Sequence, residues 1–209
     1  MAQKAFASIL DKRKSDIVTA VLRLVDRVGI TGLTTKRIAK EVGFVEGALY
    51  KHVRSKNDIF RLILDSSGLA IEDLSQDISR RGLGPEQSLR AWFDFAVSFL
   101  EAYPGIYRIL FSDGLYTGEK AMFQQFKGCM FDLLSRIQGV IERGIAEKVF
   151  WPDLNPASNA VMFLGVIHTT FTFWTVFENR ARSYKKTAQS YFEEYMRSLR
   201  IPSREAARG

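Results

Sequence analysis

The sequence predicts an all-α protein with about nine helices, and three observations support this fold class. Apolar residues recur at spacings of three and four, and no stretch alternates apolar and polar residues as a half-buried strand would. No Asn-Gly or Asp-Gly hairpin joins two apolar runs. Pro85, Pro104 and Pro156 each open an apolar run, which is typical of prolines in the first turn of a helix.

Three short helices are expected before residue 57. The first carries an apolar stripe and ends near Gly29, and its stripe is formed by Ile17, Val18, Val21, Val25 and Val28. The next two are expected at 35–42 and 46–52, separated by Gly43. Together they predict an N-terminal three-helix unit.

Six further helices complete the predicted fold. A long one begins near Lys56, where Ser55 and Asp58 have the spacing of a capping box, with Asp in place of the usual Glu or Gln. Gly82-Leu83-Gly84-Pro85 interrupts this helix. The other helices are expected at 85–102, 104–112, 119–146, 156–181 and 184–200.

Charge and aromatic side chains divide the chain into two parts. Residues 1–57 hold 12 basic and 5 acidic side chains, which accounts for the whole net charge of +7, and 58–209 hold 18 of each. Of 26 aromatic residues, 23 lie in 58–209. We therefore expect residues 1–57 to be a basic arm and a unit that meets an anionic surface. Residues 58–209 are expected to be a larger helical domain that buries large rings.

Composition makes several classes of protein improbable. Cys129 is the single cysteine, and His52 and His168 are far apart, so we expect no disulfide framework, no metal site and no cofactor. No nucleophile, base and orienting group share a catalytic spacing, so an enzyme is not expected. The N-terminus lacks a signal-peptide core, which favours the cytoplasm. The uncharged stretch 160–177 contains a histidine and four threonines, which favours a buried helix over a membrane span.

Residues 33–53 have the spacing of a helix-turn-helix. Thr34 or Thr35 can cap the first helix, and Gly43 can supply the left-handed turn that ends it. Leu49 and Val53, four residues apart, can anchor the second helix inward. The outward residues of that helix are then Glu46, Gly47, Ala48, Tyr50, Lys51 and His52. Short side chains at its start suit a groove floor, and the later polar ones can reach phosphates. A helical hairpin with a solvated basic face is the simpler alternative.

From about Ile17 to Leu64 the sequence resembles the TetR family of bacterial transcriptional regulators. The resemblance rests on the first helix, on T-T-K-R-I-A, on the glycine turn and on G-A-L-Y-K-H-V-R-S-K. Beyond residue 64 only the helical architecture and the length are similar. The resemblance implies a homodimer with a helix-turn-helix in each subunit, a C-terminal domain for ligand binding and dimerisation, and in most members a repressor released by a small molecule.

The resemblance also assigns contacts to a double-stranded DNA operator. It places Thr35 and Lys36 near phosphates or a groove edge, and Lys56 at a phosphate. It places Glu46, Gly47 and Ala48 at base edges. It gives Tyr50 and His52 to the DNA backbone. The predicted DNA-binding residues are Thr34, Thr35, Lys36, Glu46, Gly47, Ala48, Tyr50, Lys51, His52 and Lys56. The sequence departs from the common pattern at Phe44, Val45 and Val53, which concerns packing and the turn.

Two readings stay open for the aromatic half of the chain, a filled core or the lining of a cavity. A cavity would suit a bulky, mainly apolar small molecule. The predicted ligand-binding residues are Phe95, Phe99, Tyr103, Tyr107, Phe111, Phe126, Met130, His168, Phe171 and Trp174. For His168 a hydrogen-bonded place in the core or an interface is the commoner outcome.

The last two helices are expected to form the dimer interface, because they combine small residues with a tyrosine stripe. The predicted interface residues are Leu164, Gly165, Thr172, Tyr184, Tyr191 and Tyr195. The sequence thus predicts a DNA-binding regulator with a hydrophobic effector. The alternative is a DNA-binding protein of the same architecture that is controlled by a protein partner or has no small-molecule ligand.

Overall fold

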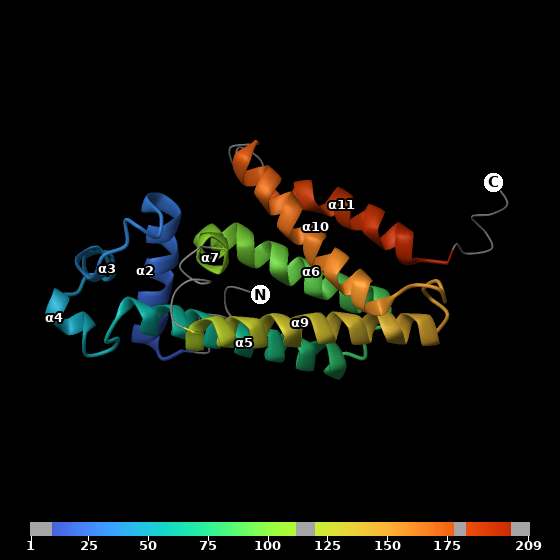
Figure 1. Ribbon diagram of the computed structural model, residues 1–209, viewed down its shortest axis with the longest axis horizontal. Helices are drawn as coiled ribbons and strands as arrows, with labels where there is room; N and C mark the ends of the chain where they lie inside the picture. The colour runs from blue at the N-terminus through green and yellow to red at the C-terminus, as the bar shows by residue number, and fades with distance from the viewer. Residues whose placement is uncertain (1–9, 112–119, 178–182, 202–209) are drawn as a thin grey trace. The chain divides into compact units, whose positions relative to one another are not determined.

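A computed structural model describes residues 10–111, 120–177 and 183–201. In these residues the chain forms nine α-helices and no strand beyond one isolated bridge between Phe150 and Arg200, which confirms the all-α prediction (Figure 1). The helices are α2 (Lys12–Val28), α3 (Thr35–Val42), α4 (Glu46–Leu49), α5 (Lys56–Arg80), α6 (Pro85–Ala102), α7 (Pro104–Leu110), α9 (Lys120–Ala146), α10 (Pro156–Val176) and α11 (Tyr184–Leu199).

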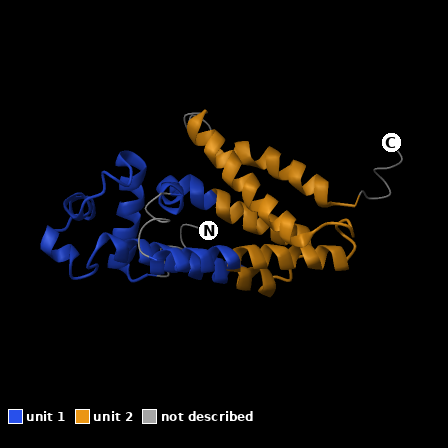
Figure 2. Cartoon of the chain, viewed as in Figure 1, with its two compact units in different colours: residues 1–74, 98–131 blue, residues 75–97, 132–209 orange. Residues whose placement is uncertain are grey.

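The chain divides into two compact units, one formed by 1–74 with 98–131 and the other by 75–97 with 132–209 (Figure 2). Helices α5, α6 and α9 each contribute to both units. The sequence predicts a boundary after residue 57, between a DNA-binding part and a part for ligand binding and dimerisation. This functional boundary differs from the boundaries of the two compact units, and it stays a prediction.

In the first unit, α2 is the central helix. Its N-cap residue Asp11 accepts a 3.0 Å hydrogen bond from the backbone N–H of Lys14, which lowers the pKa of the Asp11 carboxyl. Four residues of the predicted stripe are buried, whereas Val28 is 39% exposed because the helix ends there, at Gly29. An ion pair also joins α2 to α3, with the guanidinium of Arg27 2.5 Å from the carboxylate of Glu41.

Helix α7 lies directly against the backbone of α2. A Cβ atom at Gly105 would stand only 2.1 Å from the carbonyl oxygen of Leu22 and 3.1 Å from the backbone nitrogen of Asp26. Gly105 is therefore required by the close approach of the two helices. An apolar cluster lies in the same unit and joins α5, α7 and α9, with Leu64, Met122 and Phe126 buried and Phe60, Leu110, Phe123 and Met130 packed around them.

One half of the capping box predicted before α5 is formed. The hydroxyl of Ser55 accepts a hydrogen bond from the backbone N–H of Asp58 at 3.1 Å. The carboxylate of Asp58 accepts one from the backbone N–H of Arg54 at 3.0 Å. Asp58 thus bonds to the residue before the cap, whereas the Glu or Gln of a capping box bonds to the cap residue itself.

In the second unit, α10 and α11 pack side by side (Figure 1). Phe163 and Phe171 of α10 meet Tyr184, Phe192 and Tyr195 of α11 edge to face. Phe192 also stacks on Phe93 of α6, with ring centroids 4.1 Å apart. This arrangement fills the space between the helices with aromatic rings.

Three ion pairs connect α6 with α11 and with Arg200, the residue that follows α11, in this unit. They join Arg90 to Glu193 at 2.6 Å, Asp94 to Lys185 at 3.7 Å, and Glu86 to Arg200 at 2.8 Å. The first is reinforced by the guanidinium of Arg90, which lies 5.1 Å from the centroid of the Phe192 ring. The hydrogen bond from Arg90 lowers the pKa of the Glu193 carboxyl.

Among the described residues, α10 is the one helix long and apolar enough to cross a membrane by length and composition. Its large side chains Phe163, Phe171 and Trp174 are buried within its own unit. Asn155 caps the helix by accepting a 2.8 Å hydrogen bond from the N–H of Ser158. The helix extends to Val176, and the expected continuation over 178–181 lies outside the described residues.

Candidate nucleic-acid interface

Helix α3 begins and ends as its sequence predicts. Thr34, rather than Thr35, is the N-cap, and its hydroxyl accepts a 3.2 Å hydrogen bond from the backbone N–H of Arg37. Gly43 ends the helix in the left-handed region at φ 79°, and the N–H of Phe44 then bonds to the carbonyl of Ala39 at 2.8 Å. The turn therefore has the geometry that the glycine makes possible.

Helix α4 is shorter than expected and ends at Leu49 instead of His52. The N–H groups of Lys51 and His52 bond three residues back, to Ala48 and Leu49, so the chain tightens into turns over 50–52. Leu49 and Val53 are buried, as their spacing indicates. The tight turn therefore follows directly on the two anchoring positions.

The ten predicted DNA-binding residues lie on or beside α3 and α4, or at the start of α5. Seven are exposed: Thr34, Lys36, Glu46, Gly47, Tyr50, Lys51 and Lys56. Thr35, Ala48 and His52 are partly buried. Tyr50 is 49% exposed, so its ring is available to a partner. Whether these residues contact DNA stays a prediction.

Two polar contacts hold this surface in place. The hydroxyl of Thr35 donates a 2.7 Å hydrogen bond to the carboxylate of Glu46, which joins the starts of α3 and α4. The ammonium of Lys56 donates one to the carbonyl of Leu33, at 3.3 Å. Two of the predicted contact residues are thus bonded to each other, which sequence spacing alone did not indicate.

The bulky Phe44 has a structural partner on each side. Its ring centroid lies 5.8 Å from that of His52, and the guanidinium of Arg13 lies 5.4 Å from it. Arg13 lies in the first turn of α2, and its contact with Phe44 joins that end of the helix to the turn between α3 and α4.

Cationic side chains on this surface are available to an anionic partner. Lys36, Lys40 and Lys51 are exposed and form no ion pair within the described part of the chain. Lys40 and Arg54 are absent from the predicted set, although both are exposed and basic. Their position in a positively charged segment was the signal that could have included them.

The predicted ligand-binding residues are distributed over both compact units. Phe99, Tyr103, Tyr107, Phe111, Phe126 and Met130 belong to the first unit, and Phe95, His168, Phe171 and Trp174 to the second. Within the first unit, Phe99 pairs with Tyr103 at 5.4 Å and Tyr107 with Phe111 at 4.6 Å. Phe126 and Met130 belong to the apolar cluster with α5 and α7.

The four residues of the second unit have two kinds of surroundings. Phe171 and Trp174 are buried, with ring centroids 5.6 Å apart, and both pack on Tyr184. His168 lies on the exposed side of α10, and partial desolvation lowers the pKa of its imidazole. His168 and the two buried rings therefore lie on different faces of one helix.

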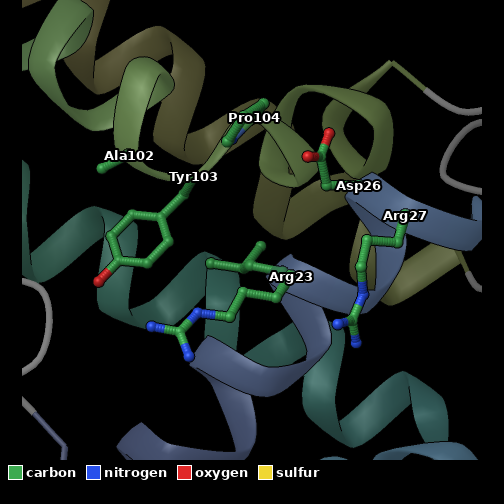
Figure 3. A pocket seen from close by; sticks show the side chains of 7 residues that line it. Arg23, Asp26, Arg27, Ala102, Tyr103 and Pro104 are labelled. Atoms are coloured by element: carbon green, nitrogen blue, oxygen red, sulfur yellow. The ribbon is translucent and has the colours of Figure 1, made fainter.

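A cleft of about 270 Å³ lies in the first unit between α2 and the junction of α6 and α7 (Figure 3). Its lining consists of Leu22, Arg23, Asp26, Arg27, Ala102, Tyr103 and Pro104. In Figure 3 the side chain of Arg23 extends to the same side as the phenol of Tyr103, and the carboxylate of Asp26 points the other way. Tyr103 is the predicted ligand residue that borders this cleft.

The predicted dimer residues differ in exposure. Thr172 and Tyr191 are exposed, and Leu164 and Gly165 are partly buried. Tyr184 and Tyr195 point into their own unit instead, where their hydroxyls donate hydrogen bonds to the carbonyls of Ile167 and Asn159 at 2.8 and 2.9 Å. Burial raises the pKa of the Tyr195 phenol. These two tyrosines therefore support α10 from within and do not present a ring to a second copy.

Additional apolar side chains are exposed on α10, beyond the predicted set. They are Val161, Met162, Phe173, Val176 and, at the helix end, Phe177, with exposed fractions between 48% and 69%.

Among the described residues no group of three or more His, Cys, Asp or Glu side chains could hold a metal ion.

Comparison with known proteins agrees with this architecture. Residues 17–63 match the model of the family described as bacterial regulatory proteins, tetR family. The HTH-type transcriptional regulator AcrR of Shigella flexneri is 25% identical over 198 residues, which cover 91% of this chain and 90% of that protein. The nucleoid occlusion factor SlmA of Photobacterium profundum is 31% identical over 136 residues, 63% of this chain and 62% of that protein.

Solved structures show the same fold. The ketosteroid transcriptional regulator KstR2 of Mycobacterium tuberculosis superposes with a TM-score of 0.75 at 17% identity, covering 92% of this chain and 97% of that one. The regulator FadR from Bacillus subtilis, in complex with stearoyl-CoA, gives 0.71 at 21% identity, covering 88% and 97%. Residues 17–63 thus carry the DNA-binding domain of the TetR family, and over most of its length the chain is similar to transcriptional regulators rather than to enzymes.

Proposed function

We propose that the protein is a homodimeric repressor that binds a palindromic operator and is released by a bulky, mainly apolar small molecule. The observation that carries the proposal is the surface of α3 and α4, where a glycine turn and the Thr35–Glu46 bond fix two helices beside unpaired cations. Such a surface suits a major groove flanked by phosphates. We place its action in the cytoplasm, on the nucleoid.

Contacts with the DNA backbone are assigned to Tyr50 and to the exposed cations that form no ion pair within the described part of the chain. Lys36 and Lys51 can each neutralise a phosphate without first breaking an ion pair. Lys56, whose ammonium bonds to Leu33, is held at the start of α5, where backbone N–H groups also favour an anion. These contacts position the protein, whereas sequence is read from the start of α4.

Dimerisation is assigned to the exposed face of α10 together with Tyr191 of α11. Val161 is 59% exposed and Val176 is 63% exposed. A helix that leaves such apolar side chains in water along its whole length is less favourable than one whose apolar face a second subunit covers. Gly165 has open space in front of its Cα, so a second helix can approach closely there. Two copies of the pair would form a four-helix core. The two α4 helices must then lie about 34 Å apart to enter successive major grooves.

The effector is assigned to the predicted ligand-binding residues of the first unit, which are Phe99, Tyr103, Tyr107, Phe111, Phe126 and Met130. They share a compact unit with α2, and α7 touches the α2 backbone at Gly105. A ligand that displaces α7 would therefore act directly on the helix that supports α3. The neighbour FadR was solved with stearoyl-CoA, and KstR2 is described as a ketosteroid regulator. Both names support an apolar compound as the effector of this chain.

Release of DNA by a ligand panel tests this function. A long-chain acyl-CoA, a steroid, an aromatic drug and a phosphorylated sugar are each added to the protein, and the melting temperature and operator affinity are measured. An apolar compound is expected to raise the melting temperature and to weaken operator binding, because it shifts the population to a form that does not bind DNA. Stabilisation by the phosphorylated sugar alone would contradict the proposal.

A second candidate is a DNA-binding protein of the same architecture that has no small-molecule effector or is controlled by a protein partner. The relatives named nucleoid occlusion factor SlmA favour it. Operator binding that no apolar compound changes would support this second candidate.

A further inference from the structure

Val45 has no role in the fold that accounts for its apolar side chain. It is 77% exposed, the largest exposed fraction among the large apolar residues that the structure describes. It is the N-cap residue of α4, and its side chain makes no capping hydrogen bond. Phe44 before it packs on His52, and Leu49 after it is fully buried, so the neighbours hold the turn.

The position of Val45 is fixed although its side chain is free. Its backbone has ordinary extended angles, φ −73° and ψ 145°, and its carbonyl accepts a 2.9 Å hydrogen bond from the N–H of Ala48. The next residue, Glu46, is bonded to Thr35 of α3. A β-branched side chain on such a backbone has few rotamers, so Val45 presents its methyl groups in a defined direction.

The surroundings of Val45 indicate what it contacts. The exposed cations Lys36 and Lys51 of the same two helices and turn suit phosphates, and Gly47 presents no side chain that would hold a base edge away. In a major groove the apolar group on the base edges is the C5 methyl of thymine. An exposed valine that leaves water against this methyl group gains free energy in proportion to the apolar area that the contact buries.

We propose that Val45 is a specificity-determining residue that packs on a thymine methyl group in each operator half-site. The proposal rests on the proposed function, in which the start of α4 lies against base edges. Glu46, beside it, cannot approach phosphates of like charge, and its carboxylate can accept from the amino group of cytosine. Val45 thus recognises thymine from a position that the helix-turn-helix spacing assigns only to the turn.

The experiment replaces thymine by uracil, which removes the methyl group and changes nothing else. A preferred duplex is selected from a random pool with the full-length protein, and each dT of a half-site is then changed to dU. Binding of the wild type is expected to weaken about fourfold at one position in each half-site, the worth of one buried methyl group. Val45→Ala should bind the dT and dU duplexes equally at that position.

Two controls keep the outcome interpretable. Val28→Ala, which shortens another exposed valine, should retain the wild-type sensitivity to dU, and the melting temperature of Val45→Ala should be unchanged because the side chain is exposed. Lys51→Ala should weaken dT and dU duplexes alike. If the wild type binds its selected duplex but ignores every dU, or if Val45→Ala keeps the sensitivity, this inference is wrong. If no duplex is selected at all, the proposed function fails instead.

Discussion

The hydroxyl of Thr35, in the first turn of α3, donates a 2.7 Å hydrogen bond to the carboxylate of Glu46, in the first turn of α4. The bond crosses the turn at Gly43 and ties together the starts of the two helices that form the proposed DNA surface. It also gives the one acidic side chain of α4 a defined position. A carboxylate held in this way can discriminate between bases without approaching the phosphates.

Thr35→Val is therefore expected to relax sequence discrimination. The variant keeps the shape of the side chain and removes the donor, so specific affinity should fall about 3- to 10-fold more than non-specific affinity. Thr35→Ser, which keeps the hydroxyl, serves as the matched control. Titration of operator and scrambled duplexes by fluorescence anisotropy measures both affinities, and equal losses on the two duplexes would argue against positioning of Glu46.

Gly105→Ala is expected to disturb the contact between α7 and α2. The added methyl group would meet the Leu22 carbonyl at 2.1 Å, so we expect the free energy of unfolding to fall by about 1–3 kcal/mol. Gly128→Ala in α9, where the same atom would meet nothing within 4 Å, should be neutral or slightly stabilising. Urea denaturation compares the two variants. Equal midpoints would show that α7 can move away from α2 at no cost.

The ion pair between Arg90 and Glu193 should contribute a pH-dependent part of the stability. The hydrogen bond from Arg90 lowers the pKa of Glu193 below its unfolded value of 4.5, so its contribution is present above that pH. It is lost as the pH falls through the lower pKa of the folded protein. Glu193→Gln should therefore lower the urea midpoint slightly at pH 7 and have no effect near pH 3, because an exposed pair contributes less than about 1 kcal/mol. A difference that persists at low pH would point to packing instead.

Val161→Asp is expected to convert the protein from a dimer to a monomer. The substitution places a charge on the exposed face of α10, where two copies would otherwise exclude water. Leu69→Asp in α5, an apolar side chain that is 51% exposed, is the control and should leave the mass unchanged. Sedimentation at micromolar concentration measures the mass. A wild type that sediments as a monomer would contradict the proposed interface.

Caps and breaks that a sequence displays directly predicted both ends of α3, the end of α2 near Gly29 and the start of α5 near Lys56, whereas the start of α2 after Asp11 was not predicted. Gly43 and the Ser55–Asp58 pair are examples. The early end of α4 was not predicted, since it depends on bonds from Lys51 and His52 that close tight turns. The spacing of apolar residues predicts which residues share a helix face, but it does not predict whether an aromatic ring on that face is buried or exposed. Tyr184 and Tyr191 share a stripe by spacing, yet only Tyr191 is exposed, because α11 packs on α10 through Tyr184.

Contacts between segments far apart in sequence were also outside the reach of periodicity. The approach of Gly105 to Leu22 and the pairing of Arg13 with Phe44 depend on the tertiary packing of α2. The surface cations were predictable because charge concentrates in the first 57 residues.

The salt dependence of operator binding tests the central claim, that the surface of α3 and α4 binds DNA through its free cations. Operator affinity is measured by anisotropy over a salt series for the wild type and for Lys51→Ala. The account predicts a loss of about 10³-fold or more between about 50 and 200 mM salt, with a slope that is shallower by about two in the dimeric Lys51→Ala variant. An affinity that does not change with salt, or a slope that Lys51→Ala leaves unaltered, would contradict it.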